Sequence, residues 1–79
     1  MDQAKRKEVI KSALENALSN TIAQMAITQV DEQALQRMNV LEPNGELLRE
    51  IGMTQRNIKV LVQRIGVIEE RLKEMETVA

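Results

Sequence analysis

The second half of the chain carries aliphatic residues that recur every seven positions. The repeat consists of Ile51, Ile58, Ile65 and Leu72. A second series lies three residues after the first, and its members are Thr54, Leu61, Ile68 and Met75, respectively. This spacing corresponds to positions a and d of a coiled-coil heptad, with β-branched residues at position a. Leu48 and Val62, at position e, widen the seam into the broader stripe of a bundle helix. The pattern predicts a helix over about residues 46–76.

A weaker apolar stripe lies on another side of the same predicted helix. Met53, Val60 and Val67 also repeat every seven residues, at position c, and Gly52 and Gly66 occupy the neighbouring position b. A glycine inside a helix costs about 1 kcal/mol relative to alanine. These two glycines are either tolerated at a solvated surface, or they admit another backbone or a small ligand. We therefore predict that these five residues form a second interface or a partner-binding surface.

The first half of the chain is less regular. One stripe contains Ile10, Leu14, Leu18, Ile22 and Met25, and the spacing then resets to Ile27, Val30, Ala34, Met38 and Leu41. Two interpretations remain open for this predicted helix, which covers about residues 2–38. A continuous helix could change the side that it buries, or the helix could break near residue 28, where Thr28 or Asp31 could cap a separate segment. Residues 21–30 contain neither Gly nor Pro, which favours continuity.

The two predicted helices are separated by the one segment with strong turn chemistry. Pro43 disfavours a helical conformation at Glu42, and Asn44 followed by Gly45 is typical of a turn. Asn44 can also cap the helix that follows. These signals predict a loop over about residues 39–45. Two long helices joined by such a loop form a long helical hairpin, so we predict a single all-α domain over residues 1–79.

Composition excludes most kinds of chemistry. The 79 residues include no Cys, no His and no aromatic residue, which removes disulfides, the usual zinc ligands and the common catalytic bases and thiol nucleophiles. We expect no enzymatic activity, no cofactor and no metal. A net charge of −1 makes nucleic-acid binding an unlikely role, in spite of a basic cluster at Lys5, Arg6, Lys7 and Lys11. No apolar run approaches the about 20 residues of a membrane span, so we expect no membrane association and a cytoplasmic location.

A hairpin of two helices cannot shelter this much aliphatic surface by itself. Each fully buried large aliphatic side chain contributes about 1.5–3 kcal/mol, and half-covered stripes contribute much less. Two hairpins that pair into a four-helix bundle would enclose the stripes of all four helices, and a twofold dimer is the commonest closed assembly. We therefore predict a homodimer or a higher oligomer. The predicted oligomer interface comprises Leu48, Ile51, Ile58, Leu61, Val62, Ile65, Ile68 and Leu72.

Two functions of different classes fit these patterns, and the spacings indicate no particular family. The first is a non-enzymatic, homo-oligomeric protein–protein interaction module that presents a helical face to itself or to another protein, as an adaptor, small chaperone, inhibitor or structural accessory. The second is a protein that binds or sequesters a small anionic ligand of the nucleotide type in a pocket between protomers. In that case Arg56, Lys59 and Arg64 are the candidate anion-binding residues.

Overall fold

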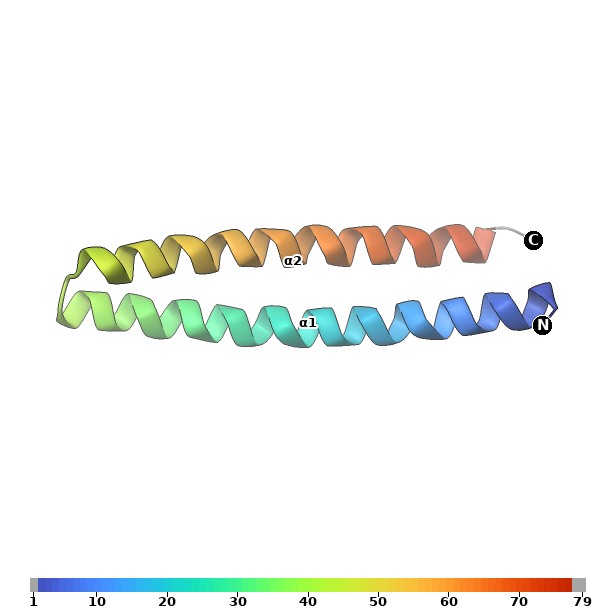
Figure 1. Ribbon diagram of the computed structural model, residues 1–79, viewed down its shortest axis with the longest axis horizontal. Coiled ribbons are helices and arrows are strands. Elements are labelled where there is room, and N and C mark those ends of the chain that lie inside the picture. Colours follow the sequence, from blue (N-terminus) through green and yellow to red (C-terminus); the bar gives the residue numbers. More distant parts are fainter. Residues whose placement is uncertain (1, 78–79) are drawn as a thin grey trace.

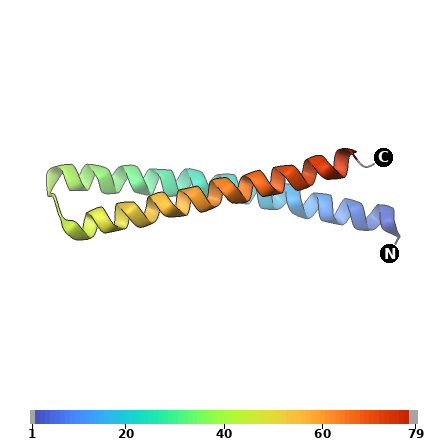
Figure 2. The same ribbon diagram turned by 90° about the horizontal axis from the view of Figure 1, so that it is seen from above.

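The chain forms two long antiparallel helices joined by a tight turn, and the computed structural model describes residues 2–77 (Figure 1). Helix α1 spans Gln3–Leu41 and helix α2 spans Gly45–Thr77. The molecule is a rod of 59 × 15 × 15 Å, and α2 crosses over α1 near the middle of the rod (Figure 2). The predicted all-α hairpin is confirmed. Residues 1, 78 and 79 of the predicted domain lie outside the described part.

Helix α1 is continuous through the segment where a break was one of the two alternatives. Its 39 residues include Thr28, whose hydroxyl donates a hydrogen bond of 2.8 Å to the Gln24 carbonyl, so Thr28 is an interior helical residue and not a cap. The helix begins where the Asp2 carboxylate accepts a bond of 2.8 Å from the Lys5 backbone N–H. This side chain satisfies one of the free N–H groups that every helix start presents.

The turn is shorter than the predicted loop, because α1 continues to Leu41. Glu42 adopts φ −139° and ψ 86°, outside the helical region, as expected for a residue before proline. Asn44 caps α2 as predicted: its Oδ1 accepts a bond of 2.8 Å from the Glu46 N–H. Residues 42–44 therefore suffice to reverse the chain.

Burial in both helices follows the heptad spacing. In α2 the buried and half-buried side chains are Leu47, Ile51, Thr54, Ile58, Leu61, Ile65, Ile68, Leu72 and Met75. In α1 the seam consists of Leu14, Leu18, Thr21, Met25, Thr28, Glu32, Leu35 and Asn39. Both series alternate steps of three and four residues, which is the a/d pattern of a coiled coil. The hairpin is thus an antiparallel coiled coil formed within one chain.

The structure corrects the expectation that α1 either breaks or changes the side that it buries. The same side of α1 faces α2 from Leu14 to Asn39, and the later half of this seam contains Thr28, Glu32 and Asn39. The aliphatic residues of the reset stripe point elsewhere, and Ile27 and Val30 are each 63% exposed. Two helices that wind around each other keep one seam, because the supercoil cancels the drift of about 20° per heptad that a straight α-helix would show.

The resulting core is thin. Only four residues of the described chain are largely hidden from solvent, namely Ile51, Leu61, Ile68 and Thr21, and no side chain is completely buried. The chain exposes 6530 Å² of surface, whereas a compact monomer of 9.0 kDa exposes about 4,800 Å². The isolated hairpin therefore leaves an excess of surface, much of it aliphatic.

Candidate protein-binding face

Heptad geometry divides the exposed surface of the hairpin into two long faces. In an antiparallel coiled coil, the g positions of the two helices lie side by side along one edge of the seam, with the c positions next to them, while the e and b positions form the opposite side. We call the surface formed by positions g and c the groove face. Its large aliphatic members are Ile10, Ile27, Met38 and Leu41 from α1, and Met53, Val60 and Val67 from α2.

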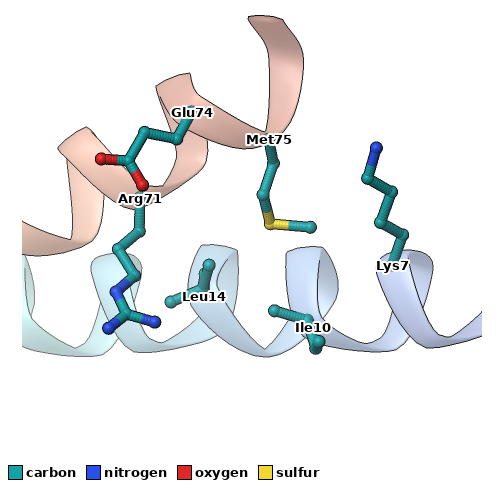
Figure 3. A pocket seen from close by; sticks show the side chains of 6 residues that line it. All are labelled: Lys7, Ile10, Leu14, Arg71, Glu74 and Met75. Carbon is teal, nitrogen blue, oxygen red and sulfur yellow. The ribbon is translucent and has the colours of Figure 1, made fainter. Parts of the chain in front are cut away.

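Shallow hollows along this face show that the two helices contribute to it together. Near the termini, Met75 of α2 points toward Ile10 and Leu14 of α1, beside a hollow of about 300 Å³ (Figure 3). Lys7, Arg71 and Glu74 complete its lining. The aliphatic wall of this hollow belongs to both helices, so the groove face is a joint product of the fold.

Two further hollows follow on the same face in the direction of the turn. The middle one lies between Gln24 and Thr28 of α1 and Val60 and Arg64 of α2. The third lies nearer the turn, where Ala34 of α1 stands beside Met53 of α2. Met53 and Val60 of the position-c stripe thus border hollows that α1 also lines, and the hollows follow one another along the rod.

The groove face holds more than half of the exposed large hydrophobic side chains of the described residues. Met53, Val60 and Val67 are 62%, 52% and 55% exposed, and Ile27 and Met38 are exposed to a similar degree. Scattered exposed aliphatics are ordinary on protein surfaces, but aliphatics gathered on one side of a rod are typical of an interaction surface.

Charge on the groove face changes sign along the rod. The half near the turn carries Asp31, Glu46 and Glu50, whereas the half near the termini carries Arg64 and Arg71. All five residues are exposed. Glu74 is the acidic exception in the basic half. The face is therefore polarised, acidic at one end and basic at the other.

The opposite face contains part of both predicted interfaces. Leu48 and Val62 occupy position e there, and Gly52 and Gly66 occupy position b. A Cβ added to either glycine would meet no atom within 4 Å. The structure thus separates these two glycines from Met53, Val60 and Val67, with which the sequence grouped them.

The remaining residues of the predicted oligomer interface lie in the seam between α1 and α2 of one chain. They are Ile51, Ile58, Leu61, Ile65, Ile68 and Leu72, all of them buried or half-buried there. Their packing within the hairpin is clear, and their participation in a contact between copies stays a prediction.

The three candidate anion-binding residues point in different directions from α2. Arg64 at position g borders the groove beside Val60, whereas Arg56 at position f faces outward and Lys59 at position b belongs to the opposite face. Of the three, only Arg64 lines one of the hollows described above, and an anion site between copies stays a prediction. Within residues 2–77, no group of acidic side chains is arranged to hold a metal ion.

Neither described helix is long and apolar enough to cross a membrane. Comparisons with known proteins found no matching family model, no similar curated protein and no similar solved structure.

Sequence patterns identified the α2 part of the groove face but missed the α1 part. The apolar spacing of Ile27, Ala34 and Met38 predicts either a change in the side that the helix buries or a separate helical segment, whereas the structure places these residues on the groove face of a continuous helix. The signal that would have placed them is the unbroken spacing of Thr28, Glu32, Leu35 and Asn39 with the earlier seam residues, because it continues the heptad with mostly polar side chains.

Proposed function

We propose that this chain is a non-enzymatic protein–protein interaction module that works as a homo-oligomer and binds through its groove face. The observation that supports this function most strongly is the joint exposure of Met53, Val60 and Val67 beside Ile27, on one face of a rod with a thin core. Burial of such side chains contributes about 25 cal/mol per Å² of apolar surface.

The shape of the groove face favours a helical partner. Two ridges with shallow hollows between them can accept the side chains of another helix or helical pair, as in four-helix bundles. The hollow near the termini is mainly apolar, whereas the middle one also presents Gln24, Asn57 and Arg64. Partner helices would cover side chains from both α1 and α2 at once. An adaptor, a small chaperone, an inhibitor and a structural accessory would all use this mode of binding.

Sedimentation velocity across a dilution series from micromolar to millimolar chain tests the proposal. We expect the wild-type protein to sediment as an oligomer, and Val60→Glu to weaken association at least tenfold by placing a charge in the apolar stripe. Gln63→Glu is the matched control, because it adds the same charge at outward position f. Circular dichroism of both variants checks that the helices persist.

Two results would contradict the proposed function. One is a wild-type chain that melts cooperatively as a compact monomer at every concentration. The other is an equal effect of Val60→Glu and Gln63→Glu on association, because net charge and not the groove face would then control it.

A further inference from the structure

We propose that a second copy of this chain docks on the groove face with its turn at the opposite end of the rod. In this dimer α2 packs antiparallel against α2 of the other copy, and Val60 lies on the twofold axis. The inference rests on the proposed function and adds the identity, orientation and register of the partner. Three observations support it: the spacing of the aliphatics, the polarity of the charges and the size of the face.

The aliphatic stripe of α2 is symmetric about Val60. Met53 lies seven residues before it and Val67 seven residues after it. A twofold axis through Val60 brings Met53 of each copy against Val67 of the other, and it brings the two Val60 side chains together. The same operation places Glu50, ten residues before the axis, opposite Arg71, eleven residues after it. A self-complementary surface of this kind is what a twofold interface requires.

Charge selects the antiparallel orientation over the parallel one. With both turns at the same end, Glu46 and Glu50 of the two copies would gather at one end and Arg64 and Arg71 at the other, which is repulsive. Asp31 borders the same hollow as Asn57 and lies close to the level of the axis, so it favours neither orientation. With the turns at opposite ends, the acidic half of each copy meets the basic half of its partner. Glu46 then lies level with Glu74 of the second copy, and these two carboxylates repel each other. Arg71 of the second copy lies about one helical turn from its Glu74 and reduces this repulsion.

Helix α1 fits the same axis. Thr28 and Leu61 border one hollow of the groove face, so the axis passes α1 close to residue 29. Ile27 lies within one helical turn of this level and faces the same helix in the second copy. Leu41 then reaches Ala17 of the second copy, where a small side chain leaves space for a large one. The α1 helices of the two copies therefore add aliphatic contacts on both sides of the axis.

The face is large enough for a specific dimer. The 33 residues of α2 give a length of about 50 Å, and the rod is 15 Å wide. Because α1 pairs only over residues 17–41 in this register, the paired region offers about 630 Å² per copy, or about 1,260 Å² in total, within the about 1,200–2,000 Å² that specific interfaces bury.

Cysteine cross-linking tests the position of the axis, since the wild-type chain contains no cysteine. We expect Val60→Cys to form a disulfide-linked dimer rapidly under mild oxidation, because the facing Cα atoms of two packed helices come within the about 4.4–6.8 Å that a disulfide spans. Val62→Cys is the matched control: residue 62 is 48% exposed, against 52% for residue 60, but it lies on the opposite face. We expect it to cross-link at least tenfold more slowly.

A mixed cross-link tests the direction of the two copies. Met53→Cys alone and Val67→Cys alone should give little disulfide dimer, because each new thiol lies about 20 Å from its symmetry mate. An equimolar mixture of the two variants should give a heterodimeric disulfide. Two variants that cross-link only with themselves would overturn the antiparallel register.

Charge reversal provides a test without oxidation. We expect Glu50→Arg and Arg71→Glu each to weaken dimerisation about tenfold, because each variant places like charges opposite one another at two symmetric positions. An equimolar mixture of the two variants should restore association through a heterodimer. A mixture as weak as its components would contradict the pairing of residues 50 and 71.

The outcomes separate this inference from the proposed function. A dimer that resists Val60→Glu and cross-links through Val62→Cys overturns the register and the face together. A dimer weakened by Val60→Glu that fails both cross-linking tests overturns the register but leaves the groove face as the binding surface. A wild-type monomer at every concentration overturns both proposals.

Discussion

The Asn39 side chain accepts a hydrogen bond of 3.1 Å from the backbone N–H of Asn44, across the turn that joins the two helices. Asn39 occupies a half-buried seam position in the last turns of α1. Asn44 uses its own Oδ1 to cap α2. The end of α1 and the start of α2 are thus tied by two consecutive side chain–backbone bonds.

Removal of this tie should destabilise the hairpin. We expect Asn39→Ala to lower the free energy of unfolding by about 1 kcal/mol, which is typical of one lost hydrogen bond. Asn39→Asp keeps an acceptor oxygen at the same place and should lose less. Urea denaturation followed by circular dichroism at a fixed chain concentration measures both changes. Equal losses in the two variants would show that the bond to Asn44 contributes nothing.

Alanine at either helical glycine should stabilise the protein. Gly52→Ala and Gly66→Ala should each raise the free energy of unfolding by about 1 kcal/mol, because the new methyl group meets no atom within 4 Å. Both sites lie on the face opposite the groove face, so the dissociation constant should stay within about twofold of wild type. A large loss of association would instead indicate that another backbone approaches the glycines closely.

A polar residue in the seam offers a second route to higher stability. Glu32 is half-buried at position a of α1 and accepts a bond of 3.2 Å from the Gln36 amide on the solvent side. Glu32→Leu forfeits roughly 0.2–0.5 kcal/mol from that helical pair. The added apolar contact with α2 is worth about 1–1.5 kcal/mol for partial burial. Thermal unfolding should therefore show a net gain for Glu32→Leu, and none for Gln33→Leu, which points outward.

Two neighbouring residues should separate folding from association. Leu61 is 5% exposed in the seam and Val60 is 52% exposed on the groove face. We expect Leu61→Ala to destabilise the hairpin by about 2–3 kcal/mol at every chain concentration. Val60→Ala should mainly reduce the rise of the melting temperature with chain concentration, because it weakens association and not the fold of the hairpin. Melting curves at concentrations a hundredfold apart compare the two effects, and an identical dependence in both variants would place Val60 in the folding core.

The seam of α2 was predictable because nearly every one of its positions is an aliphatic residue at heptad spacing. Ile51, Leu61 and Ile68 are the best-covered aliphatics of the described chain, and each belongs to the predicted stripe. The seam of α1 was not predictable in this way, because Thr28, Glu32 and Asn39 occupy seam positions while Ile27 and Val30 are exposed. Polar side chains carry no periodic hydrophobic signal, so the pattern pointed to the wrong side of the helix.

The sequence by itself determined the two helices, a turn around Pro43 and Asn44 and the shortage of core. These properties depend on local chemistry: helix-forming residues without interruption, proline and asparagine between them, and more aliphatic surface than the two helices of one chain can enclose. Only the tertiary structure decided which side of α1 meets α2, and hence that Met53, Val60 and Val67 share a face with Ile27. That choice is made once for the whole helix, because a long helix that winds around its neighbour packs along a single seam, and the summed contacts of the seam outweigh any local preference.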